Sequence, residues 1–158
     1  MKNLKPIFGL AVVLIASLAV LTHSLSKGAR PVLASSEQNG QLHITKLCPD
    51  YHYAAGDHCT IATSNVSELP PGTTVYYDQA FGIPAGNLDS NIMLFVSSGD
   101  WAVGRCTVEA ATGKGLCTVT DGVGPLAGFT GRVNVVIDFT TGITYWDGTY
   151  SFNALPNR

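Results

Sequence analysis

The chain has 158 residues, a formal net charge of −2 and four cysteines, and 46% of its residues are hydrophobic. It shows no internal repeat, heptad pattern or low-complexity tract, which excludes repeat proteins and coiled coils. Without the first 34 residues, five Lys and Arg remain against eleven Asp and Glu, a net charge of −6. Such an acidic chain without a basic stripe argues against nucleic-acid binding.

Residues 1–34 have the pattern of a secretory signal peptide. Lys2 and Lys5 precede an apolar run over residues 7–21, which is shorter than the ~20 residues that a membrane-spanning helix needs. Cleavage after Ala34 would leave a mature chain that begins at Ser35 and is secreted or periplasmic. The alternative is an uncleaved signal anchor, and only then would the protein be attached to a membrane.

Residues 35–41 are expected to be a flexible segment, and residues 42–155 to form one domain of antiparallel sheet. Short β-branched and aromatic runs recur there between Gly, Pro, Asn and Asp clusters, and no long stretch has helical periodicity. About eight strands in so small a domain favour closure into an eight-stranded antiparallel β-barrel. The expected strands are 42–47, 59–63, 73–81, 92–97, 101–109, 115–120, 129–139 and 143–152, with glycine-containing hairpin turns at 111–114 and 140–142.

The four cysteines form two pairs of equal spacing, each enclosing ten residues: Cys48 with Cys59, and Cys106 with Cys117. An exported chain favours two disulfides, each worth about 2–3 kcal/mol in the chain-entropy model. The alternative for the first pair is a zinc site, because several further ligands lie nearby in sequence. These are His43, Asp50, His52, Asp57 and His58. The close cysteine pair of common zinc motifs is absent, so we expect disulfides and no metal.

Three segments resemble the allene oxide cyclase and dirigent barrel superfamily, in particular its bacterial barrel-like members. They are residues 99–107 (GDWAVGRCT), 115–131 (GLCTVTDGVGPLAGFTG) and 145–152 (YWDGTYSF). The resemblance covers roughly residues 73–152 and is best at the Gly-x-Gly-x-Leu-x-Gly-Phe segment 122–129. It implies an eight-stranded barrel with an apolar cavity, often a trimer, that binds a hydrophobic small molecule and guides its cyclisation or coupling without a cofactor.

One departure from that family concerns the reaction. In plant allene oxide cyclases a glutamate on the first strand assists catalysis, whereas residues 42–47 (LHITKL) contain no carboxylate. This difference argues against a jasmonate-type reaction. Three functions therefore stay open: a barrel enzyme or guide protein for an apolar small molecule, a lipocalin-like carrier without catalysis, and an extracellular interaction module whose barrel is filled by its own side chains.

The candidate site is chosen from polar and aromatic side chains within expected strands, because burying such groups is costly unless they pair or meet a ligand. Asp78 is the candidate proton donor or acceptor, Arg105 would hold an oxyanion or keep Asp78 ionised, and Tyr145 would donate a hydrogen bond. Tyr77 and Trp101 are candidate wall residues. The residue alternation on 101–109 leaves open whether the set with Arg105 or the small apolar set with Cys106 faces the interior.

Overall fold

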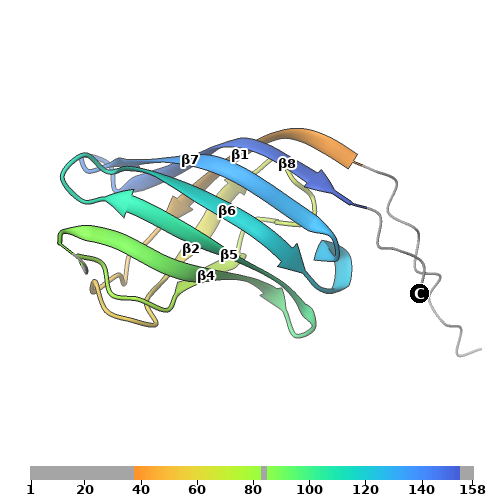
Figure 1. Ribbon diagram of the computed structural model, residues 1–158, viewed down its shortest axis with the longest axis horizontal. Coiled ribbons are helices and arrows are strands. Elements are labelled where there is room, and N and C mark those ends of the chain that lie inside the picture. Colours follow the sequence, from red (N-terminus) through yellow and green to blue (C-terminus); the bar gives the residue numbers. More distant parts are fainter. Residues whose placement is uncertain (1–37, 83–84, 154–158) are drawn as a thin grey trace, which may run out of the picture. The chain divides into compact units, whose positions relative to one another are not determined.

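The computed structural model describes residues 38–82 and 85–153, which form a closed antiparallel barrel of eight strands (Figure 1). Each strand pairs with the next along the chain, and the last pairs with the first over its whole length, so the barrel has no free edge. The strands are β1 (Gln38–Leu47), β2 (His58–Ser64), β3 (Thr74–Tyr77), β4 (Asn87–Ser97), β5 (Asp100–Glu109), β6 (Lys114–Gly122), β7 (Phe129–Asp138) and β8 (Ile143–Phe152).

The expected barrel is confirmed, and three strand ends differ from the sequence expectation by four or five residues, the others by at most two. β1 starts at Gln38, so residues 38–41 pair with β8 instead of forming a flexible segment. β3 ends at Tyr77 instead of reaching residue 81, and β4 begins at Asn87 instead of Ile92. The early part of β4 is rich in Asn, Asp and Ser, which are poor strand formers, but its pairing with β5 overrides that preference. The predicted leader lies outside the described residues.

The interior of the barrel is set by the alternation of side chains along the strands. On β5, Ala102, Cys106 and Val108 are buried, whereas Arg105 and Thr107 are exposed. The small apolar set therefore faces inward, and the set that carries Arg105 faces solvent. This orientation leaves room inside the barrel, because the inward side chains of β5 are short.

Both predicted disulfides are present. Cys106 and Cys117 are directly opposite in the register of β5 and β6, and their bond closes the hairpin from the inside of the barrel. Cys48 and Cys59 tie the loop that follows β1 to the second residue of β2. Two disulfides are consistent with an oxidising compartment.

One end of the barrel is closed by the glycine-rich segment that precedes β7. A single 3₁₀ turn, η1 (Gly124–Leu126), places Leu126 in the core, which also contains the rings of Phe129 and Phe152. Gly128 has a φ of 77°, and a Cβ there would lie 2.3 Å from the main-chain oxygen of Asn153, so only glycine fits. Within the described residues, no helix is long and apolar enough to span a membrane.

Candidate functional site

A cavity of about 280 Å³ lies at the opposite end of the barrel, among the β1–β2, β3–β4 and β7–β8 connections. Its walls are mainly apolar and include Leu88, Val108, Val135 and both disulfides. Tyr53 and Phe139 also line it, and both are more than 60% exposed, so the cavity reaches the molecular surface. An open, mostly apolar cavity with few polar groups is the usual form of a small-molecule site.

The polar centre of this cavity is Lys46, near the end of β1. Leu42 and Ile44 face the core, and the alternation carries Lys46 to the same side, where it is only 1% exposed. A bulge opposite it in β2 keeps Ile61 buried as well, because Ala62 is the extra residue. Strand period and register therefore force the lysine into the barrel.

The amine of Lys46 has two close partners, both aromatic. Nζ donates a hydrogen bond of 2.5 Å to the hydroxyl of Tyr77 on β3, and it lies 4.0 Å from the ring centroid of Trp146 on β8. No carboxylate lies within ion-pairing distance of it in the described part of the chain. The amine is thus held in place without a neutralising charge.

Burial without a counter-charge determines the protonation of the site. Desolvation lowers the pKa of Lys46 from 10.5 to about 7, so a large part of the amine is neutral at physiological pH. Burial raises the pKa of Tyr77 far above its ordinary value, and the neighbouring Tyr51 adds to that effect. A neutral lysine beside a protonated phenol can act as a nucleophile, a base or a hydrogen-bond donor.

Two further donors of the cavity lack partners. The indole Nε1 of Trp146 and the hydroxyl of Tyr51 are both inaccessible to solvent and have no hydrogen-bond partner among the described residues. Both residues line the cavity, and Trp146 is only 1% exposed. Because buried polar groups are normally hydrogen-bonded, these two groups have unused hydrogen-bonding capacity next to the cavity.

An aromatic cluster stands at the mouth of the cavity. Tyr51, Tyr53 and Phe81 form edge-to-face pairs with ring centroids 5.6–6.4 Å apart. The loop that carries the two tyrosines is fixed by the Cys48–Cys59 disulfide and by Asp57, whose carboxylate accepts hydrogen bonds from two main-chain amides of the loop. Tyr51, Tyr53 and Phe81 thus surround the mouth of the cavity as a fixed cluster of rings, the aromatic collar.

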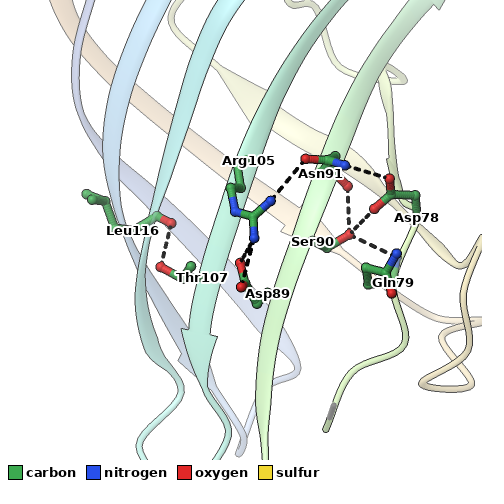
Figure 2. A network of polar contacts seen from close by, with 8 residues as sticks. All are labelled: Asp78, Gln79, Asp89, Ser90, Asn91, Arg105, Thr107 and Leu116. Carbon is green, nitrogen blue, oxygen red and sulfur yellow. Dashed lines mark hydrogen bonds and ion pairs between the residues drawn. The ribbon is translucent and has the colours of Figure 1, made fainter. Parts of the chain in front are cut away.

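The structure places Arg105 and Asp78 on the outer surface, in a polar network across β4 and β5 (Figure 2). The guanidinium of Arg105 lies 2.8 Å from the carboxylate of Asp89 and 3.3 Å from Asn91. Asp78 follows β3 and accepts a hydrogen bond of 2.9 Å from the same Asn91, which holds the pKa of Asp78 below its ordinary value. Asn91 thus joins the two residues, but neither lines the cavity.

The remaining predicted residues are divided between the two faces. Tyr77 lines the cavity, as a wall residue was expected to do. Tyr145 faces outward between the buried Thr144 and Trp146, and Trp101 stands on the outward set of β5 opposite Phe95 of β4. The catalytic assignment of Asp78, Arg105 and Tyr145 stays a prediction that no observation tests, and the structure does not bring these three together.

The structure also shows how the residues of the alternative zinc site are arranged. Cys48 and Cys59 are bonded to each other, and the carboxylate of Asp57 is used by the loop main chain. His43 pairs with Asp147 of β8 on the outer face, with His43 Nδ1 2.7 Å from the carboxylate. Within residues 38–82 and 85–153, no group of three His, Cys, Asp or Glu side chains is arranged to hold a metal ion.

Comparison of the chain with protein-family models, with curated proteins and with solved structures found no match. The resemblance to allene oxide cyclase and dirigent barrels is therefore neither supported nor refuted by a relative. The geometry of the cavity is the evidence that bears on function.

Proposed function

We propose that the protein is an exported barrel that binds an apolar small molecule in the cavity around Lys46. The observation that carries the proposal is a buried amine without a counter-charge at the centre of an apolar cavity that reaches the surface. Burying such a group costs several kcal/mol unless it is paired or meets a ligand. A purely structural barrel would gain stability from an aliphatic side chain at this position.

The size of the cavity limits the ligand. Small-molecule sites usually span about 300–1,000 Å³, and an apolar cavity of about 150 Å³ already holds benzene. At about 280 Å³, this cavity fits a ligand with one ring and a short chain. The aromatic collar would contact the part of the ligand nearest to solvent.

The polar groups of the cavity favour a ligand with an acceptor oxygen. Lys46, Tyr51 and Trp146 all offer N–H or O–H donors, and no carboxylate lines the cavity in the described part of the chain. A carbonyl or carboxyl oxygen would satisfy these donors, whereas a ligand cation would lie beside the amine without a partner. Binding of this kind needs no catalysis and agrees with the carrier function.

Export is supported by two independent features. The first 34 residues have the composition of a secretory signal, and the two disulfides suit an oxidising compartment. The family resemblance adds an expectation of cofactor-free cyclisation or coupling, which would take place in the same cavity. Both a carrier and a barrel that guides cyclisation or coupling must first bind the small molecule.

The proposal is tested by filling the cavity from its mouth. Ile137→Trp places a large ring into the cavity that Ile137 lines, while Val136→Trp adds the same ring one residue away, on the exposed face. Methyl 4-butylbenzoate, an apolar ester with an acceptor oxygen, is titrated by calorimetry into the mature protein and both variants. We expect the wild type and Val136→Trp to bind alike and Ile137→Trp to lose at least tenfold in affinity.

Near-ultraviolet circular dichroism of each variant serves as the folding control. If the ester binds a folded Ile137→Trp variant as tightly as the wild type, the ligand does not occupy this cavity. If the wild type binds neither the ester nor its parent acid, the proposal that the cavity binds an apolar small molecule is wrong.

A further inference from the structure

The side chain of Lys46 is unusual for a group that only anchors a ligand. Its amine is enclosed by the rings of Tyr77 and Trp146 and is almost inaccessible to bulk water, yet it lines a cavity that opens at the aromatic collar. The titratable side chains that line the cavity with it are Tyr51, Tyr53 and Tyr77, and none of them is a carboxylate that would hold the amine protonated.

We propose that Lys46 Nζ is a nucleophile that captures an apolar aldehyde or ketone in this cavity as a reversible imine. The inference rests on the proposed binding function and names its ligand class. A carbonyl group is both an acceptor for the donors of the cavity and an electrophile for a neutral amine.

The step balances without any further reactant. The nitrogen lone pair forms the C–N bond, the π pair of the carbonyl moves to oxygen, and the oxygen takes the proton that the nitrogen releases. Loss of this oxygen as water, together with the remaining N–H proton, forms the C=N bond. Water is the only by-product, and hydrolysis by one water molecule restores the amine and the carbonyl compound.

The neighbours of Lys46 suit this chemistry. Because burial raises its pKa, the Tyr77 hydroxyl keeps its proton and can donate a hydrogen bond to the carbonyl oxygen next to the attacking amine. The Trp146 ring, 4.0 Å from Nζ, lies where it would stabilise a protonated imine by the same cation–π contact that it makes with the lysine. The lowered pKa of Lys46 supplies the neutral amine near pH 7.

The chain provides its own control for the test. Lys46 and Lys114 are the two lysines of the described residues, and Lys114 is exposed at the start of β6. The mature protein is incubated at pH 7.4 with 4-butylbenzaldehyde and cyanoborohydride, which reduces an imine to a stable secondary amine. Peptide mass spectrometry then measures the modification at Lys46, at Lys114 and at the α-amino group separately.

We expect Lys46 to be modified at least tenfold faster than Lys114, and this modification to disappear in the Ile137→Trp variant, which blocks the cavity. In Lys46→Met, the aldehyde should modify only the exposed amines. Equal modification of the two lysines, or none at Lys46, overturns the inference.

The ester titration separates this failure from that of the binding function. If methyl 4-butylbenzoate binds but the aldehyde is not trapped at Lys46, the cavity binds ligands without covalent capture. If neither compound binds or reacts, both the binding function and the imine formation at Lys46 are contradicted.

Discussion

Lys46 gives the stability of this barrel a specific dependence on pH. Burial lowers its pKa to about 7 in the folded protein, from a value of 10.5 for an exposed lysine. Between these two values the unfolded chain binds more protons than the folded one, so the free energy of unfolding rises with pH. At about 1.36 kcal/mol per pKa unit, the rise between pH 7 and pH 10 is roughly 3 kcal/mol. Well below pH 7 both states are protonated, and the contribution of Lys46 no longer changes with pH.

Other groups near the amine determine where the rise ends. The Trp146 ring favours the ammonium form in the folded protein and therefore works against this rise. The pKa of Tyr77 is raised by burial, which means that the unfolded chain loses this proton above about pH 10 while the folded protein keeps it. Stability should then fall again, because the folded state binds more protons there. A stability maximum near pH 10 is expected.

Guanidinium chloride unfolding without reductant, followed by tryptophan fluorescence at pH 7, 8, 9 and 10, measures this dependence. Lys46→Met keeps most of the side-chain volume and removes the amine. The free energy of unfolding of this variant should therefore not rise between pH 7 and pH 10. Lys114→Met removes an exposed amine instead and should keep the wild-type slope. A wild-type free energy that does not change between pH 7 and pH 10, or an equal slope in Lys46→Met, would refute the argument.

Two further predictions concern the frame of the cavity. Replacing both Cys48 and Cys59 by alanine should cost about 2–3 kcal/mol in guanidinium unfolding, and it should also weaken ester binding in calorimetry, because their bond fixes the loop with the aromatic collar. Gly148→Ala should cost about 1–3 kcal/mol, since its Cβ would lie 2.0 Å from the main-chain oxygen of Arg132. Gly131→Ala, with 3.7 Å to the nearest atom, should be neutral or stabilise the protein by up to about 1 kcal/mol. Equal stability of the two alanine variants would contradict the steric argument.

The architecture was predictable because it depends on local signals. β-Branched and aromatic runs mark the strands, and Gly113 and Gly142 take the positive φ that their hairpin turns require. The equal cysteine spacing indicated both disulfides. The start of β4 was missed, because Asp89 and its polar neighbours are stabilised there by a cross-strand partner, Arg105, that no local window contains.

The candidate site was harder to predict, because a strand pattern gives two faces without saying which is inside. Asp78 and Arg105 were chosen because charged groups in strands are costly when buried, but both have solvent or polar neighbours on the outer surface. A signal for Lys46 was present in the sequence. Leu42 and Ile44 are apolar at alternate positions, and continuing this alternation along the same strand reaches Lys46.

The two polar features of the barrel differ in what they contribute to folding. An exposed ion pair such as that of Arg105 and Asp89 adds about 0–1 kcal/mol to the free energy of unfolding, so it does not destabilise the fold. Lys46 lowers stability at neutral pH, since an amine that prefers water is held among aromatic rings. A barrel that needed only to be stable would gain from methionine or leucine at this position. The destabilising residue, and not the more conspicuous surface network, is therefore where the chemistry of this protein should be sought.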